Sequence, residues 1–207
     1  MICFRCYRII LVSVVLLSSL CAPAQDLNWI KQTWGQYGVK MAVDNDGNVY
    51  LHGDYYSTGS IIDGVALDSS GDEHVFTAKY NSHGQLLWAA SAESLSSSYS
   101  PNAVCCDQSG NVYITGYFIN KMQFDSIILQ SSGHSNGYIA KYNSEGQLQW
   151  AKQFKSDGTY LYDIKTDAFQ NCYVAGTFSY PIIYNDSVVG VPSGSDENFM
   201  LAKIDEN

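Results

Sequence analysis

The segment AKYNSHGQLLWA at residues 78–89 returns 62 residues later as AKYNSEGQLQWA at residues 140–151. It starts a third time as AKIDEN at residues 202–207, again 62 residues further on. A second block behaves alike: DNDGNVYLHG at residues 44–53 matches DQSGNVYITG at 107–116 and, more loosely, DAFQNCYVAG at 167–176. Self-similarity at a fixed period is the signature of repeat architectures, in which each unit packs on its neighbours. Three units therefore occupy most of the 207-residue chain.

Each unit is predicted to form four strands, because β-branched and aromatic residues alternate between turns rich in Gly, Asn and Asp. No segment combines helical periodicity with capping residues, so the fold class is predicted to be all-β. A variable stretch with a short extra strand separates the second and third strands. The predicted first strands are 39–44, 103–107 and 163–167; the second 49–55, 112–118 and 172–178; the extra 60–67, 124–129 and 182–189; the third 75–80, 137–142 and 199–204; the fourth 85–90 and 147–154.

Antiparallel strands repeated in this way predict a β-propeller-like array of three four-stranded blades of about 62 residues each. The third unit breaks off at Asp205-Glu206-Asn207, whereas residues 27–32 (LNWIKQ) align with the fourth strand at 148–153 (LQWAKQ). We therefore expect segment 27–32 to complete the last blade and remove an exposed edge. Propeller rings usually hold about four to eight blades. Three alternatives stay open: a partial array, copies that associate into a larger ring (two giving six blades), or a strained three-blade ring.

The N-terminus predicts export. Residues 1–24 combine a basic start at Arg5 and Arg8, an apolar run at 9–17 and a small-residue exit, which is the pattern of a signal peptide. The repeat domain is then 25–207, and removing both arginines takes the formal net charge from −9 to −11. Nucleic-acid binding needs clustered basic residues and is excluded. No later apolar run is long enough to span a membrane.

The pattern resembles the SBBP repeats, a family of β-propeller repeats from secreted and cell-surface proteins of bacteria and archaea, including surface-layer-like glycoproteins. The segments that carry the resemblance are 107–118, 78–89 and 140–151, and it extends over about residues 27–207. The third unit departs from the pattern, because Gln170 stands where the turn glycine is expected. The resemblance implies a secreted or cell-surface location. Two Asp-Ser-aliphatic segments, at 125–127 and 186–188, resemble the O-glycosylation pattern of exported Bacteroidetes proteins and fit that location.

Two sets of residues stand out within the units. Residues that recur with the unit are predicted to serve packing between blades; they are Trp29, Trp88, Trp150, Gly53, Gly116, Gly176, Tyr80 and Tyr142. Aromatic residues that do not recur are better candidates for ligand binding, because propellers display variable surface near strand ends and in the loops between units. These candidates are Trp34, Tyr37, Tyr55, Tyr56, Tyr99, Tyr160 and Tyr162.

The chain shows no pattern of metal, cofactor or catalytic chemistry. Residues 44–48 space oxygen-bearing side chains like the start of a calcium loop, but Tyr55 stands where an EF-hand needs its bidentate carboxylate, so a turn is favoured. The histidines are scattered and are predicted to be solvated or to lie in turns. No nucleophile elbow or Cys–His pairing occurs. Cys105, Cys106 and Cys172 are predicted to be inert buried thiols, with a bond to Cys172 as the open alternative.

The sequence therefore predicts an exported, non-catalytic β-propeller repeat protein. It is expected to act as a binding or display module at the cell surface or outside the cell. Its expected partner is a protein or glycan, with no nucleic acid and no cofactor, and a homo-oligomer that completes a ring is a further possibility. Two alternatives are kept: a lectin assembled from several chains, and an enzyme related to quinoprotein-type propeller dehydrogenases with its site in the central channel. Fold alone does not name a ligand.

Overall fold

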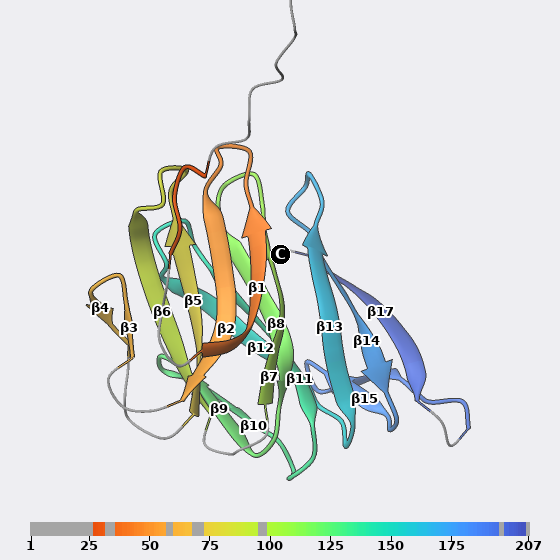
Figure 1. Cartoon of the computed structure of the whole chain (residues 1–207). Coiled ribbons are helices and arrows are strands. Elements are labelled where there is room, and N and C mark those ends of the chain that lie inside the picture. Colours follow the sequence, from red (N-terminus) through yellow and green to blue (C-terminus); the bar gives the residue numbers. More distant parts are fainter. Residues whose placement is uncertain are drawn as a thin grey trace, which may run out of the picture.

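The computed structural model of the chain describes residues 27–31, 36–56, 60–67, 73–94, 99–194 and 197–205. The predicted signal peptide (1–24) and Trp34 lie outside these ranges. Within them the chain is all-β, and it contains no helix of the length and apolarity that a membrane crossing requires. The strands form antiparallel sheets that stack as three blades (Figure 1).

Each blade follows the order that the repeat predicts, with the first strand of the unit innermost. The first blade holds β1 (Gln36–Val43), β2 (Val49–Tyr56), β5 (Glu73–Tyr80) and β6 (Leu86–Ser94). The second holds β7 (Tyr99–Cys106), β8 (Val112–Phe118), β11 (Asn136–Tyr142) and β12 (Leu148–Phe154). The third holds β13 (Thr159–Thr166), β14 (Cys172–Phe178) and β17 (Asn198–Ile204). The all-β, propeller-like fold class is thus confirmed.

The variable stretch of each unit forms a two-stranded hairpin, where a single short strand was expected. The hairpins are β3 (Ile61–Ile62) with β4 (Val65–Ala66), β9 (Lys121–Phe124) with β10 (Ile127–Gln130), and β15 (Ile182–Tyr184) with β16 (Ser187–Gly190). Their tips carry residues with positive φ, such as Asp63 and Asn185, which reverse the chain within two residues. The second and third hairpins reach toward the preceding unit: β9 pairs with β6, and Ile183 bridges to Lys155 after β12.

The recurring glycine was expected to serve packing between blades, but in the second and third units it accommodates a bulge in the first strand of its own blade. The register shifts between Pro101 and Ala103 in β7 and between Leu161 and Asp163 in β13, so that one extra residue bends the strand toward its neighbour. A Cβ on Gly116 would overlap the carbonyl oxygen of Ser100, and the third unit repeats this close approach at Gly176. In the first unit the backbone is less close, and a Cβ on Gly53 would instead meet the Phe76 ring at 2.7 Å.

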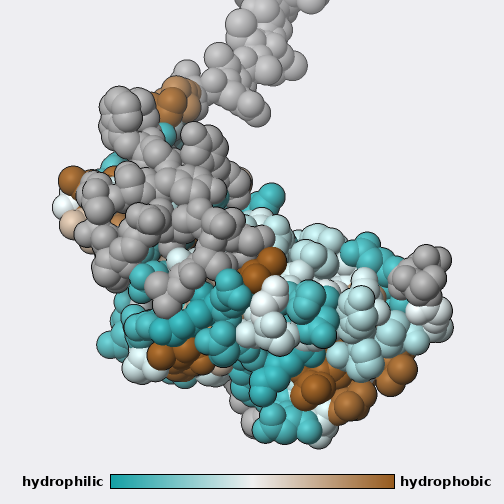
Figure 2. Space-filling view, turned by 90° about the horizontal axis from the view of Figure 1, so that it is seen from below, coloured by the Kyte–Doolittle hydropathy of each residue, from teal (hydrophilic) through white to brown (hydrophobic). Residues whose placement is uncertain are grey.

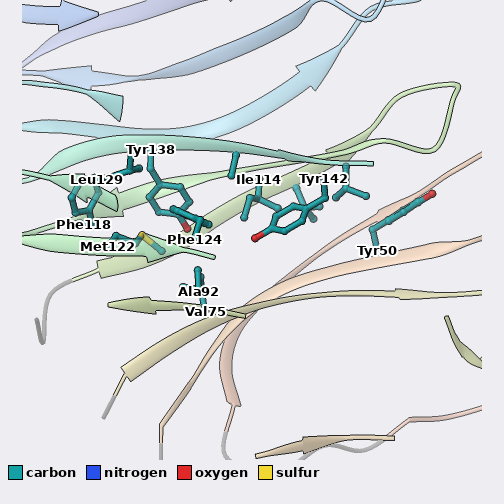
Figure 3. Close-up of a cluster of buried hydrophobic side chains, with 13 residues drawn as sticks. Tyr50, Val75, Ala92, Ile114, Phe118, Met122, Phe124, Leu129, Tyr138 and Tyr142 are labelled. Atoms are coloured by element: carbon teal, nitrogen blue, oxygen red, sulfur yellow. The ribbon is translucent and has the colours of Figure 1, made fainter. Parts of the chain in front are cut away.

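The core lies between the blades. Figure 3 shows the cluster between the first and second blades, where Tyr50, Val75 and Ala92 face the group formed by Ile114, Phe118 and Tyr138. A second cluster between the second and third blades contains Ile139, Phe154, Leu161 and Ile164. The predicted repeat tyrosines Tyr80 and Tyr142 are both buried. Stability therefore depends on the stacking of units, as in other repeat proteins.

Two of the histidines correct the expectation that this residue would be solvated. His52 and His74 are fully buried in the first blade, because both lie on the strand faces that the neighbouring elements cover. His52 Nδ1 lies 2.9 Å from the carbonyl oxygen of Phe76, and its Nε2 lies 3.1 Å from the Tyr138 hydroxyl of the second blade. The His74 ring stacks on Tyr55 at 4.8 Å. The buried His52 ring is tolerated because both of its nitrogens are hydrogen-bonded.

Burial lowers the pKa of His52 to about 4, so this residue makes stability depend on pH. In the unfolded chain His52 binds a proton near pH 6.5, whereas the folded protein resists protonation down to about pH 4. The stabilisation is therefore complete above pH 6.5 and is lost progressively as the pH falls from 6.5 through about 4, by roughly 3 kcal/mol in all. We expect His52→Thr, which introduces the residue of the second unit, to flatten this pH dependence in thermal unfolding followed by circular dichroism. The exposed His83→Thr serves as control, and an equal slope in both variants would contradict the assignment.

Candidate functional site

The structure brings the turns between the first and second strands of all three units together at one end of the inner strands. They line a polar pocket of about 320 Å³ that contains Asp44, Asp107 and Asp167, together with Lys79 and Cys106. Asp46 also lines this pocket, so four carboxylates lie there and invite a metal or catalytic interpretation. The hydrogen bonds of Asp44, Asp107 and Asp167 argue against it.

Each of these carboxylates is occupied by its own turn. Asp44 Oδ1 accepts the amide N–H groups of Asp46 and Asn48 at 3.0 and 2.8 Å, and its Oδ2 accepts the Asn48 side-chain amide and the Tyr50 hydroxyl at 2.8 and 2.9 Å. Asp107 and Asp167 accept the same four bonds in their units. Burial alone would raise the pKa of Asp44, but these hydrogen bonds outweigh it and the pKa is lowered. The turn interpretation of residues 44–48 therefore agrees with the geometry.

A lysine completes this arrangement in every unit. The ammonium groups of Lys79, Lys141 and Lys203 lie 5.1, 5.2 and 6.0 Å above the centroids of Tyr50, Tyr113 and Tyr173. The repeated Ala-Lys-Tyr segment thus places a cation on the tyrosine whose hydroxyl binds the turn carboxylate. Among the described residues no three His, Cys, Asp or Glu side chains gather as a cation site would need. The carboxylates of Asp44, Asp107 and Asp167 in the pocket therefore hold their own turns together.

The recurring tryptophans join one blade to the next. Trp88 in β6 donates its indole N–H to the carbonyl oxygen of Ser144 at 3.0 Å, and its ring lies where a Cβ on Gly146 would stand. Trp29 makes the equivalent bond to Ser82 at 3.2 Å, with its ring against Gly84. Thus the tryptophan of a fourth strand packs on the turn of the unit that follows it. Trp150, which packs against the core between the second and third blades, meets Tyr113 edge to face at 6.2 Å.

The opposite end of the inner strands carries the candidate ligand-binding surface. Tyr117 at the end of β8 meets Tyr160 at the start of β13 edge to face, with centroids 4.9 Å apart. Tyr160 lies parallel to Tyr162, at 6.5 Å and 6° between the ring planes. Tyr162 is 51% exposed and the other two are partly exposed. We call Tyr117, Tyr160 and Tyr162 the tyrosine patch. Tyr162 is the extra residue of the β13 bulge, which turns its ring outward.

The remaining predicted ligand residues divide into three groups. Tyr55 is fully buried between His74 and Phe76, so the structure removes it from the candidates; the outer end of β2 is covered there by the hairpin of its own unit. Tyr99 is partly buried and packs against the core of the second blade. Trp34 and the side chains of Tyr37 and Tyr56 lie outside the described part of the chain. Sequence analysis did not select Tyr117, although this residue does not recur either: Asp54 and Thr177 occupy the equivalent positions of the other units.

The three cysteines of the described chain are free thiols, as predicted. Cys105 and Cys172 are buried between the second and third blades, and Cys106 is half-buried at the pocket of the turns. Burial raises the pKa of Cys106 to about 11 and that of Cys172 to about 12. They are therefore protonated at neutral pH and poorly nucleophilic.

Comparison with known proteins agrees with the fold. No family model matches the chain. The chain is similar to an "Uncharacterized WD repeat-containing protein" of Acanthamoeba polyphaga mimivirus, with 26% identity over 172 residues. The match covers 68% of this chain but only 12% of the mimivirus protein. WD repeats are four-stranded propeller blades. The blades and this likeness together define a β-propeller-type repeat protein, while the narrower assignment to the SBBP repeats stays a prediction.

Proposed function

We propose that this protein is an exported, non-catalytic binding module that holds a protein partner at the cell surface or outside the cell, and that the tyrosine patch is its contact surface. The observation that carries the proposal is the patch itself: three tyrosines from two blades touch one another at one end of the inner strands while remaining partly exposed. Tyrosine supplies large contact area with few rotatable bonds and is enriched among the residues that dominate binding energy.

The rest of the molecule supports a binding role. The repeated carboxylates hold turns, burial raises the pKa of the three thiols of the described chain, and the blades form a rigid support for strand-end residues. Export is supported by the N-terminal pattern at 1–24. A glycan is the alternative ligand, because exposed aromatic rings also stack on sugars. The enzyme alternative would place its site in the central channel of the propeller rather than at the patch.

A paired binding experiment tests the proposal. The bait is the protein recovered from outside the producing cells, where its first residue is expected to be Gln25. A partner captured from the surface and secreted fraction is measured by biolayer interferometry against the wild type and the double variant Tyr117→Ser, Tyr160→Ser. We expect affinity to fall by at least about 100-fold, as for two central interface tyrosines. Phe169→Ser is the matched control, since Phe169 is 84% exposed at the opposite end of β13.

Three results would contradict the proposal in different ways. Equal affinity of the double variant and the wild type would show that the tyrosine patch is not the contact surface. Patch-dependent binding on a glycan array, with no protein captured, would make the protein a lectin. Turnover of glycosidase, lyase or dehydrogenase substrates by the purified protein would show that it is an enzyme rather than a non-catalytic binding module.

A further inference from the structure

The two ends of the blade array expose surfaces that the inner blades bury. In the first blade Met41 is 65% exposed, whereas the equivalent residues Val104 and Ile164 are 5% and 0% exposed, because each packs on the blade before it. In the third blade Leu201 is 66% exposed, whereas its equivalent Ile139 is fully buried against the blade after it. The contrast arises from position in the stack, since all these residues occupy matching strands.

More apolar side chains share each of these faces. Val39 and Val43 flank Met41 on β1 with 47% and 54% exposure. Phe199 precedes Leu201 on the same face of β17 and is 71% exposed, although its equivalent Val75 in the first blade is buried. Figure 2 shows hydrophobic surface on the side of the molecule where the third blade lies. Contiguous exposed apolar surface of this kind marks an interaction site.

The edges of the sheets are complementary as well. In the described chain β17 pairs with β14 alone, so its outer edge has no fourth strand. Segment 27–31 was expected to complete the third blade, but within the described chain it does not pair with β17. Its contacts are with the first blade, through Trp29 on Ser82 and through Lys31, which forms an ion pair with Asp63 at 2.6 Å. It thus occupies the place of a fourth strand belonging to a blade that would precede the first. Figure 1 shows this segment and β17 on opposite sides of the array.

We propose that two copies of this chain associate head to tail, with segment 27–31 of each copy pairing with β17 of the other and Met41 covering the face that contains Leu201. Each copy supplies what the described residues of the other do not provide: a fourth strand for the third blade and a covering blade for its outer face. Repetition of a head-to-tail contact yields a closed ring when the rotation closes. Two copies give six blades, within the range of about four to eight that propellers adopt.

The register of the exchanged strand follows from the other blades. Ala78 pairs with Ala89 in the first blade, and Ala140 pairs with Ala151 in the second. The matching pair between copies is Ala202 with Ile30. Each copy's Trp29 keeps its bond to Ser82 of its own first blade, so the exchanged strand is held on both sides.

The first test uses the purified full chain in sedimentation velocity. We expect twice the monomer mass at micromolar concentration. Met41→Lys and Leu201→Glu, each at an exposed position of the single chain, are each expected to give monomers that retain the wild-type far-UV spectrum. Ile128→Lys, at a 53% exposed position on the β10 hairpin, is the control and is expected to stay dimeric. A wild type that stays monomeric up to 100 times that concentration would overturn the proposal.

Mixing distinguishes a head-to-tail contact from a symmetric one. In an equimolar mixture of Met41→Lys and Leu201→Glu, one of the two contacts unites unaltered faces and the other brings lysine toward glutamate, so dimers are expected to return. A symmetric contact between like faces predicts no such recovery and would overturn the head-to-tail arrangement. As an independent measurement, Ile30→Cys combined with Ala202→Cys is expected to form a covalent dimer on oxidation, whereas neither single variant does. Absence of this cross-link in a dimeric variant would overturn the strand exchange.

Discussion

Gly116→Ala is expected to lower the free energy of unfolding by about 3 kcal/mol or more. The bulge in β7 brings the carbonyl oxygen of Ser100 against Gly116, and the added Cβ would overlap that oxygen. Relief requires the backbone of β7 or β8 to move, and both strands lie in the core between blades. Backbone displacement in a packed core is among the few mechanisms that produce losses of this size. Urea unfolding followed by far-UV circular dichroism measures the change.

A matched glycine separates this effect from a general cost of replacing glycine. Gly158→Ala places its Cβ 3.5 Å from Ser179, which is ordinary van der Waals contact, and the change is expected to stay within about 0.5 kcal/mol. Gly176→Ala should behave like Gly116→Ala, because its Cβ would overlap the carbonyl oxygen of Tyr160. Similar unfolding midpoints for Gly116→Ala and Gly158→Ala would show that the bulge does not require glycine.

Trp88→Ala is the second change with a large expected effect, a loss of about 3 kcal/mol. It removes a ring that packs on Gly146 and Tyr142 of the second blade and an indole N–H that satisfies the Ser144 carbonyl. Trp88→Phe keeps most of the ring contact and loses the hydrogen bond, so a loss of about 1 kcal/mol is expected. Because units in a repeat protein are stabilised by their interfaces, the variant should also uncouple the first two blades.

Hydrogen exchange provides the measurement for that uncoupling. In Trp88→Ala, amides of β5 and β6 should lose more protection than those of β14, which lies two interfaces away. Leu87→Ala, at the 51% exposed neighbouring position, is the control and should leave exchange unchanged. Uniform loss of protection over all three blades would mean that Trp88 stabilises the whole array as one unit.

Much of this fold could be predicted from local sequence. The repeated turn at Asp44, Asp107 and Asp167 encodes its own geometry, because each carboxylate binds amides two and four residues ahead. The alternation of buried and exposed residues on the strands is also local. The candidate site was harder to predict from the sequence. Tyr160 and Tyr162 were selected because they do not recur, but the contact between Tyr117 and Tyr160 depends on how the second and third blades pack.

Burial was the property that local pattern described least well. Tyr55 and His52 were both expected near the surface, yet each is fully buried, because the sequence does not show which strand face a neighbouring blade or hairpin will cover. Met41 and Leu201 show the opposite case. No neighbouring blade of the described chain covers them, so they are exposed at positions whose equivalents form the core. By itself the sequence determined the unit, its turns, its bulge glycine and its strand order, since these depend on residues close together in the chain. Tertiary structure alone decided which copies of the unit have a neighbour, because burial of a blade face requires a second blade to meet it.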